Sequence, residues 1–349
     1  MKKQILAGVL SATMVVGMGG VSVFAADDAD DKTYNIGICQ LVQHEALDAA
    51  TQGFKDAITE ELGDKVTFDE QNAQGDSNTC STIITDFVSD NVDLILANAT
   101  PALQAAAAGT ADIPILGTSV TEYGVALDLD DFDGTVGNNI SGTSDLAPLE
   151  DQAAMLNELF PDAKNVGLVY CSAEANSQYQ VDTVKAALEK LGYTCEYYAF
   201  SDSNDLSSVA TTAATESDVI YLPTDNTVAS NTEIINNICL PEKVPVIAGE
   251  EGICEGCGVA TLSISYYDLG VATGKMALKV LVDGEDISKM PIEYAPQFTK
   301  EYNPEICKEL GIEVPDDYVA IGADAEEETS EDAADAADDT AEETTEEAE

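Results

Sequence analysis

The stretch IYLPTDNTVAS, residues 220–230, reads as a short buried strand that stops at a proline and is followed by polar side chains. Three apolar or aromatic residues come first, which favours a strand in the interior of a sheet. An aspartate, an asparagine and hydroxyl groups then come directly after the proline. Because open parallel sheets bind ligands at the carboxyl ends of their strands, these polar groups mark one edge of a candidate ligand site.

The same order of elements occurs twice along the chain. Strand-like runs alternate with longer segments of helical period, which predicts βαβ units and parallel sheets. Elements of the first half recur in order in the second; VDLILANAT at 92–100, for example, matches DVIYLPTDN at 218–226, which begins 126 residues later (218 − 92). We therefore expect an α/β protein made of two similar Rossmann-like lobes with parallel sheets.

The predicted lobes are not contiguous in sequence. We expect the N-terminal lobe to cover residues 33–140 and about 264–296, and the C-terminal lobe to cover residues 141–263 and about 297–322. A further strand and helix follow the second repeat, so the chain should cross between the lobes more than twice. If the strand ends of the two lobes face each other, their polar loops line one ligand cleft.

The two ends of the chain differ in composition from the part between them. Residues 1–25 begin with two lysines, continue as an apolar run and end in small residues, which is typical of a secretory signal peptide. Residues 323–349 contain only Ala, Asp, Glu, Thr and Ser, and such a segment cannot offset the entropy lost on ordering, so we expect an acidic disordered tail. An extracytoplasmic protein follows, secreted or held at the cell surface, and periplasmic in a cell with two membranes.

The charge of the chain limits its partners. The formal net charge is -52, with 66 acidic residues and 14 basic residues, all of which are lysine. Nucleic acid and anionic lipid are therefore poor partners. Since arginine is missing from the sequence, an anionic group of a ligand would have to be held by backbone N–H groups, hydroxyls, amides or lysine.

The cysteines and the single histidine do not form a recognisable metal or catalytic motif. Cys254 and Cys257 are the closest pair of the eight cysteines, and we interpret them as a loop disulfide or as plain thiols. A zinc site would need further ligands at suitable spacing, and His44 is far away in sequence. The sequence contains no G-x-S-x-G elbow or P-loop. We expect no enzymatic activity, no cofactor and no metal.

Several short motifs indicate a particular class of protein: LDAATQGF, NISGTSDL, EANS, PTDNTVAS, GEEG and SISYYDLG. Together with the two-lobe layout, they resemble the ABC transporter substrate-binding proteins linked to tryptophan and tyrosine uptake, which have the type I periplasmic-binding-protein fold. The resemblance covers about residues 34–319. It implies capture of a small amino acid, Trp, Tyr or Phe, by lobe closure and delivery to an ABC permease and its ATPase, without chemistry on the ligand. We expect a monomer.

Some alternatives stay open at this stage. The ligand could be another amino acid, a nucleoside or a sugar, and the same fold could serve as a ligand-sensing domain. Family members from single-membrane bacteria usually carry a lipid-modified cysteine near the processing site, but the first cysteine here is Cys39. The mode of surface retention is therefore not specified by the sequence.

The predicted counter-charge for the ligand's ammonium is Asp225, because burying an ammonium without an opposing charge is very costly. The alternative is that Asp225 caps its own following helix. Glu250 and Glu251 would repel each other if both pointed into the cleft. We favour Glu251 as the cleft residue, and the alternative is two solvated glutamates.

The remaining candidates also lie at expected strand ends. Hydroxyl and amide groups at helix starts could hold the ligand's carboxylate, with simple capping as the alternative for Thr143 and Ser144, which we place at the start of a helix over 146–159. Tyr266 could form an aromatic wall or pack between the lobes. The full set of predicted ligand-binding residues is Gln40, Asn98, Thr100, Ser119, Thr143, Ser144, Asn176, Asp225, Asn226, Glu251 and Tyr266.

Overall fold

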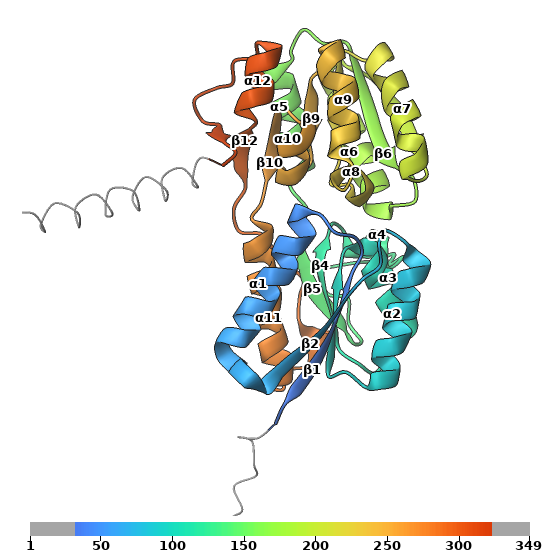
Figure 1. The fold of residues 1–349 in the computed structure, drawn as a ribbon, viewed down its shortest axis with the longest axis vertical. Helices are drawn as coiled ribbons and strands as arrows, with labels where there is room; N and C mark the ends of the chain where they lie inside the picture. Colours follow the sequence, from blue (N-terminus) through green and yellow to red (C-terminus); the bar gives the residue numbers. More distant parts are fainter. Residues whose placement is uncertain (1–31, 323–349) are drawn as a thin grey trace, which may run out of the picture. The chain divides into compact units, whose positions relative to one another are not determined.

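The structure, a computed structural model, describes residues 32–322 of the chain. The predicted signal peptide at 1–25 and the predicted acidic tail at 323–349 lie outside the described residues. The described part contains two sheets, each covered by helices (Figure 1). Each sheet and its helices form one lobe.

The first lobe is built on a six-stranded sheet in which all neighbouring strands are parallel. In spatial order its strands are β11 (Glu293–Tyr294), β5 (Ile140–Ser144), β4 (Ile115–Val120), β3 (Leu94–Asn98), β1 (Tyr34–Gln40) and β2 (Val66–Asn72). The helical segments of this lobe are α1 (Glu45–Leu62), η1 (Gly63–Lys65), α2 (Ser77–Asp90), α3 (Thr100–Gly109), α4 (Tyr123–Ala126), α11 (Tyr266–Leu281) and η2 (Ile287–Lys289).

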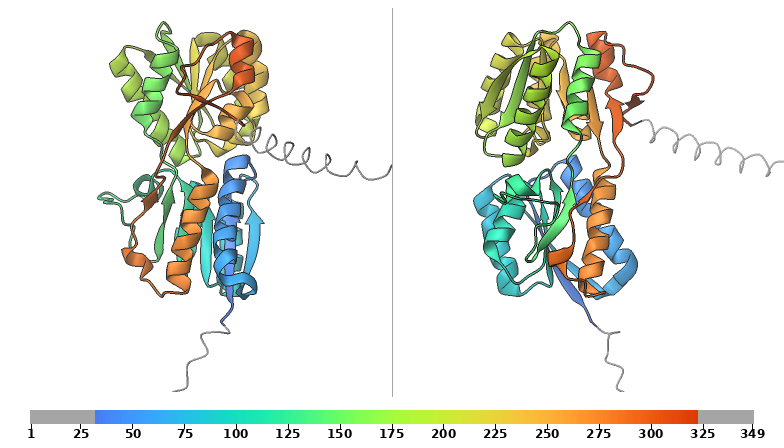
Figure 2. Two further views of the ribbon diagram at one scale, coloured as in Figure 1. Left: turned by 90° about the vertical axis from the view of Figure 1, so that its left-hand side faces the viewer. Right: turned by 180° about the vertical axis from the view of Figure 1, so that it is seen from behind.

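Helices cover both faces of the first sheet because its strands are apolar on both sides. Ile36 and Ile38 of β1 pack with residues of α1 and α11 on one face, whereas Cys39 packs with α2 and α3 on the other. The helices α1 and α11 lie side by side although more than 200 residues separate them (Figure 2). Their approach requires glycine, since a Cβ at Gly270 would overlap the carbonyl oxygen of Ala50.

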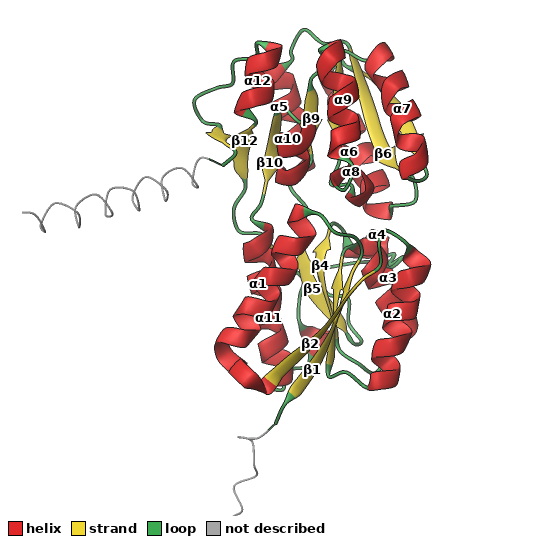
Figure 3. Ribbon diagram, in the orientation of Figure 1, coloured by secondary structure: helices red, strands yellow, loops and turns green. Residues whose placement is uncertain are grey.

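The second lobe is built on a seven-stranded sheet. In spatial order its strands are β13 (Val319–Ala320), β12 (Thr299–Tyr302), β10 (Ala260–Ser263), β9 (Val246–Ala248), β8 (Val219–Leu222), β6 (Asn165–Cys171) and β7 (Thr194–Phe200). Only the β10–β12 pair is antiparallel in this sheet. The helices of this lobe are α5 (Leu149–Leu159), α6 (Ala175–Leu191), α7 (Ser203–Glu216), α8 (Asn226–Ala229), α9 (Thr232–Glu242), α10 (Glu251–Cys257) and α12 (Pro304–Leu310). Figure 3 shows helices on both faces of this sheet as well.

The two lobes repeat one topology. The order β5-β4-β3-β1-β2 in the first sheet matches the order β10-β9-β8-β6-β7 in the second. Two corresponding helices also begin in the same way. Asp76 caps α2 by accepting from Thr79 N, and Asp202 caps α7 by accepting from Asn204 N. The predicted pair of similar parallel α/β lobes is therefore confirmed.

The chain passes between the lobes three times. The crossings follow β5, β10 and β11, because in each case the next strand along the chain belongs to the other sheet. Since β5 pairs with β4 in the first sheet, the first lobe extends to Ser144, beyond the predicted boundary at residue 140. The crossings bring the ends of both sheets to the region described next.

Candidate ligand-binding site

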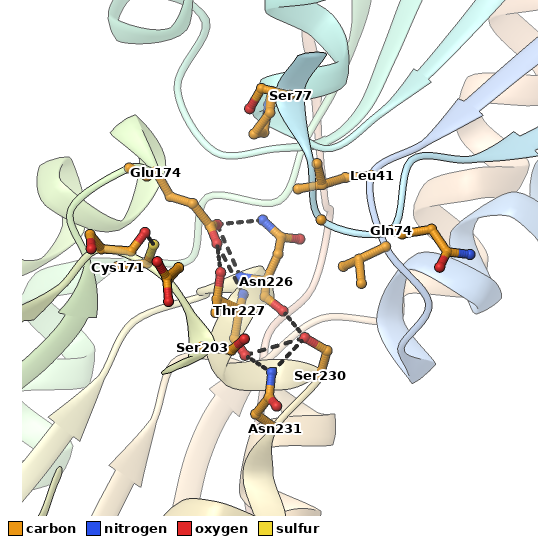
Figure 4. A pocket seen from close by; sticks show the side chains of 16 residues that line it. Leu41, Gln74, Ser77, Cys171, Glu174, Ser203, Asn226, Thr227, Ser230 and Asn231 are labelled. Carbon is orange, nitrogen blue, oxygen red and sulfur yellow. Dashed lines mark hydrogen bonds between the residues drawn. The ribbon is translucent and has the colours of Figure 1, made fainter. Parts of the chain in front are cut away.

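A cavity of about 310 Å³ lies between residues that follow strands of both lobes (Figure 4). This volume is at the lower end of the range for small-molecule pockets. The first lobe contributes Leu41, Val42, Gln74, Gly75, Ser77 and Pro101, and the second contributes Cys171, Ala173, Glu174, Ser201, Asp202, Ser203, Asn226, Thr227, Ser230 and Asn231. The carboxyl ends of the parallel strands thus form one shared cavity, as the topology predicts.

Glu174 organises the second-lobe wall of this cavity. Its carboxylate accepts hydrogen bonds from the backbone N–H and the side chain of Asn226, at 3.0 and 2.6 Å, and from the backbone N–H and hydroxyl of Thr227, at 3.0 and 2.8 Å. The side chain is 4% exposed. Glu174 therefore fixes the loop after β8. Sequence reasoning quoted the EANS motif but did not select this glutamate; its position directly after a predicted strand was the available signal.

One hydrogen bond from this loop reaches the other lobe. His44, at the start of α1, places Nε2 3.2 Å from Oδ1 of Asn226. Burial lowers the pKa of His44, which favours the neutral imidazole, while the bond to Asn226 and the charge of Glu174 act in the opposite direction. The predicted site residue Asn226 thus contacts both Glu174 and the facing lobe.

Asp225 has the capping role that was the alternative to ligand contact. Oδ1 accepts from Val228 N at 2.9 Å and Oδ2 accepts from Cys171 N at 2.7 Å, and the residue is 1% exposed. Burial, together with the neighbouring charge of Glu174, raises the pKa of Asp225 to about 7. Both carboxylate oxygens serve the protein's own backbone, so the geometry favours a structural role over the predicted counter-charge.

The two adjacent glutamates after β9 differ in burial and in role. Glu250 is 2% exposed and caps α10 by accepting from Gly252 N and Ile253 N, whereas Glu251 begins the helix and is partly exposed. The N–H groups at a helix start favour a carboxylate, which explains why Glu250 is the residue that turns inward. Burial raises the pKa of Glu250 to about 7.

Three predicted residues of the first lobe lie together at the ends of β1 and β3. Asn98 donates to Thr51 Oγ1 at 2.9 Å, and Thr51 donates to Gln40 Oε1 at 2.7 Å. Thr100 is the first residue of α3 and is 2% exposed. Hydrogen bonds join Gln40 and Asn98 to residues of α1, which fixes these strand ends against that helix.

Thr143 and Ser144 lie at the end of β5 and not at the start of a helix, which corrects the expectation. Thr143 Oγ1 is 2.8 Å from Thr273 Oγ1 in the interior of the first lobe. Ser144 Oγ donates to Thr121 O at 2.7 Å and accepts from Leu146 N. The strand continues here because Ile140–Ser144 pairs with both β4 and β11. The helix α5 begins only at Leu149.

Asp145 follows β5 in the first crossing and is 5% exposed. Tyr266 donates its hydroxyl to Asp145 Oδ2 at 3.0 Å, and Tyr266 comes from the start of α11, directly after the second crossing. Burial raises the pKa of Asp145 to about 6, against the lowering effect of the neighbouring Thr121 and Tyr266 hydroxyls. Sequence reasoning missed Asp145 because it placed this segment at a helix start; the buried aspartate of the NISGTSDL motif was the available signal.

A second contact joins the lobes near Asp145. Gln180 of α6 donates to Thr121 Oγ1 at 3.4 Å and exchanges hydrogen bonds with the backbone of Thr224, to which Asn176 also donates at 3.0 Å. Thr121 and Gln180 were not among the predicted residues. The predicted residues Asn176 and Tyr266 therefore belong to one network that includes both lobes and the first crossing.

Four buried oxygen atoms of this region have no hydrogen-bond partner within residues 32–322. They are Asn98 Oδ1, Ser119 Oγ, Asp145 Oδ1 and Asn176 Oδ1. Buried polar atoms are normally satisfied by protein, water or ligand. Their position at strand ends of both lobes and in the crossing makes them candidates for ligand contact.

A second cavity between the lobes is bordered by the carboxylates of Glu45, Glu250 and Glu255. Burial, together with a hydrogen bond to the carboxyl of Glu255, raises the pKa of Glu45 to about 7. Through these two acids α1 of one lobe meets α10 of the other. In the described part of the chain, no group of His, Cys, Asp and Glu has the arrangement of a metal site. The eight cysteines are free thiols and are buried. No helix between residues 32 and 322 is long and apolar enough to span a bilayer.

Two lobes of one topology that share a polar cavity at their strand ends define a solute-binding protein of the two-lobed type. The chain belongs to the ABC transporter substrate binding protein family, whose model matches residues 35–326. The fold is that of the type I periplasmic binding proteins, as predicted. The chain is accordingly a substrate-binding protein and not an enzyme.

Individual relatives are similar over most of their length. The tyrosine-binding protein of Clostridioides difficile (strain R20291) is 35% identical over 320 residues, which are 88% of this chain and 91% of the relative. A crystal structure of an ABC domain in complex with L-Trp from Streptococcus pneumonia is 33% identical, with a TM-score of 0.78 over 82% of this chain and 97% of that chain. The ligand-free, open structure of a substrate binding protein with adhesive properties from Clostridium difficile is 38% identical, with a TM-score of 0.64 over 83% and 99%.

Proposed function

We propose that this substrate-binding protein captures an aromatic amino acid, Trp, Tyr or Phe, in the cleft between its lobes. The observation that carries the proposal is that both lobes contribute polar groups to one site and meet through hydrogen bonds, at His44–Asn226 and at Gln180–Thr121. A ligand held by both lobes favours the state in which they are together. Capture by lobe closure follows from this differential affinity.

The choice of an aromatic amino acid rests on the relatives and on the composition of the cleft. Relatives that share about a third of their residues with this chain are named for tyrosine or were crystallised with L-Trp. Tyr266 is a buried aromatic residue whose ring packs with Ala46, Ala50 and Leu269 beside the cleft. An apolar surface of this kind suits a ligand with an aromatic side chain.

Delivery to a membrane partner completes the proposed function. Members of the family serve ABC transporters, so we infer that the ligand-loaded protein docks on a permease coupled to an ATPase. Ligand capture and docking on the permease would take place outside the cytoplasm, which agrees with the predicted signal peptide at residues 1–25. The protein would act as a monomer.

The proposal can be tested by isothermal titration calorimetry of the full chain against L-Trp, L-Tyr, L-Phe, L-Leu, adenosine and D-glucose. We expect saturable one-to-one binding of at least one aromatic amino acid, and weaker or no heat from the other compounds. Binding of adenosine or glucose, with no response to the three aromatic amino acids, would contradict the proposed ligand class.

A further inference from the structure

We propose that Asp145 is the counter-charge that holds the ligand's α-ammonium, with the side-chain oxygens of Asn176, Ser119 and Asn98 as neutral acceptors around it. This inference rests on the proposed function, because it identifies the residues that recognise an amino group within the same cleft. It assigns to the first crossing a role in binding that the sequence interpretation gave to Asp225.

The argument begins with the chemistry of the unpartnered atoms. Asp145 Oδ1, Asn176 Oδ1 and Asn98 Oδ1 can only accept hydrogen bonds, and Ser119 Oγ can accept as well as donate. All four residues are more than nine-tenths buried. Because every unpartnered atom can accept and three of them can only accept, the site favours a ligand group that donates, and an ammonium offers three N–H donors and a positive charge.

The orientation of the two amides is fixed by their other contacts. Asn98 Nδ2 donates to the carbonyl oxygen of Leu47 at 2.8 Å, and Asn176 Nδ2 donates to the carbonyl oxygen of Thr224 at 3.0 Å. A flipped amide would place its oxygen against these carbonyl oxygens. The unpartnered atoms are therefore the oxygens of both side chains.

Three of the acceptors lie on neighbouring strand ends of the first lobe. Asn98 ends β3, and the following residue donates from Ala99 N to Thr118 O at 3.0 Å, next to Ser119 of β4. Asp145, after β5, donates from its backbone N–H to Val120 O at 3.3 Å. The strands β3, β4 and β5 are adjacent in the sheet. The acceptors thus follow one another along a single edge.

The fourth acceptor comes from the facing lobe. Asn176 lies in the first turn of α6, and Gln180 of the same helix donates to Asn176 O at 3.2 Å and to Thr121 Oγ1 at 3.4 Å. Thr121 lies one residue beyond β4, beside Asp145. Contact with an ammonium would therefore link the two lobes through Asp145 and Asn176.

Comparison of the buried carboxylates identifies Asp145 as the one available for a ligand. The four buried acidic side chains of residues 32–322 are Asp145, Glu174, Asp225 and Glu250. Donors from the protein occupy both oxygens of Glu174, Asp225 and Glu250. Asp145 Oδ2 accepts from the Tyr266 hydroxyl, and the Thr121 hydroxyl lies beside this carboxyl, but Oδ1 has no hydrogen-bond partner. An ammonium would satisfy this oxygen and compensate the buried charge.

The experiment separates recognition of the amino group from other effects. L-Tyrosine, its deaminated analogue 3-(4-hydroxyphenyl)propionate and tyramine, which keeps the amino group but lacks the carboxylate, are titrated calorimetrically into wild type and Asp145→Asn. We expect Asp145→Asn to reduce the affinity for L-tyrosine and for tyramine by about 30-fold or more, because one partner of a buried charge pair is lost. Affinity for the deaminated analogue, which is weak in the wild type, should change by less than about threefold.

Two further variants serve as comparisons. Asp218→Asn alters an aspartate that also accepts backbone N–H groups, from Lys164 and Asn165, but lies at the opposite end of β8 from the cleft, and its affinities should equal those of wild type. Asp225→Asn tests the rival counter-charge. Melting temperature and circular dichroism confirm that each variant is folded before titration.

Distinct outcomes overturn the inference and the proposed function. Unchanged L-tyrosine affinity in Asp145→Asn, or equal losses for L-tyrosine and the deaminated analogue, would remove Asp145 as the counter-charge; a selective loss in Asp225→Asn alone would transfer the role there. If the wild type binds a non-aromatic amino acid, the aromatic assignment fails. The role of Asp145 is then tested by titrating Asp145→Asn with that amino acid and with its deaminated analogue. If the best ligand lacks an amino group, both proposals fail.

Discussion

His44 Nε2 lies 3.2 Å from Asn226 Oδ1, and this hydrogen bond joins the start of α1 in the first lobe to the start of α8 in the second. His44 is the single histidine of the chain. Asn226 is held in place by Glu174, which accepts from its side-chain amide at 2.6 Å. The pair therefore connects the lobes through a loop that is already rigid, and its loss should affect the closed state selectively.

Replacement of His44 by alanine should weaken ligand binding without unfolding the protein. A single hydrogen bond contributes about 0.5–1.5 kcal/mol, which corresponds to roughly a two- to tenfold loss of affinity. Calorimetry with L-tyrosine measures the change. Gln52→Ala is a matched control, because Gln52 is exposed on the same helix and bonds Asp56 within it. Equal affinities of both variants would show that the contact does not stabilise closure.

Glu174→Gln should destabilise the second lobe. Glutamine keeps one acceptor and introduces a donor opposite the N–H groups of Asn226 and Thr227, so at least one buried donor loses its partner. We expect the free energy of unfolding to fall by about 1–3 kcal/mol, measured by urea denaturation. Glu196→Gln on the exposed side of β7 is the control and should be neutral. Equal stability of the two variants would argue against an organising role for Glu174.

Stability should depend on pH through Glu250. Its pKa is raised to about 7 by burial, whereas an unfolded glutamate titrates at about 4.3, so the folded state retains the proton to higher pH. The resulting stabilisation is full below the unfolded pKa and is lost as pH rises through about 7. Asp225, with a pKa raised to about 7, acts in the same direction. The melting temperature of the wild type should therefore be lower at pH 8 than at pH 5.

Glu250→Gln identifies the contribution of this residue to the pH dependence. Glutamine carries no charge to bury and still offers an oxygen to the N–H group of Ile253. The difference in melting temperature between pH 5 and pH 8 should shrink in this variant relative to wild type. Glu313→Gln, at an exposed position of the same lobe, should leave the difference unchanged. An identical pH profile in wild type and Glu250→Gln would contradict this assignment.

Gly270→Ala should be strongly destabilising although alanine is the better helix former. Intrinsic propensity favours alanine by about 1 kcal/mol in a helix interior. The new methyl group would overlap the backbone oxygen of Ala50, and backbone cannot rotate away as a side chain can. Overpacking typically costs about 1–3 kcal/mol or more, so the clash exceeds the propensity gain. Thermal denaturation measures the result, with Lys275→Ala on the exposed side of α11 as the neutral control. A more stable Gly270→Ala would contradict the close packing of α1 and α11.

The fold could be predicted from the sequence because its signals are local and repeated. Strands such as Leu94–Asn98 and Val219–Leu222 are short, apolar and followed by polar residues, and each has a counterpart in the other half of the chain. The predicted edge of polar strand ends is the edge that carries the cavity and the unpartnered oxygens. Periodicity and duplication were sufficient for this level of description.

The roles of individual side chains could not be predicted in the same way. Asp225 and Asp145 are both acidic residues next to a predicted strand, and the difference between them arises from contacts distant in sequence. Asp225 satisfies both oxygens with nearby and cross-strand N–H groups, whereas Asp145 meets Tyr266, 121 residues away. Thr143 and Ser144 were assigned to a helix start because pairing of β5 with its neighbours is a long-range property.

The three crossings have a consequence for how the molecule is made. The first lobe needs α11 to cover one face of its sheet and β11 to complete its edge, and both are encoded after the whole of α5 to β10. A chain cut after residue 263 would leave Ile36, Ile38 and their neighbours without the helix that shields them. The first lobe can therefore be completed only when the last third of the polypeptide has been made, and contacts across such sequence distances are slow to form.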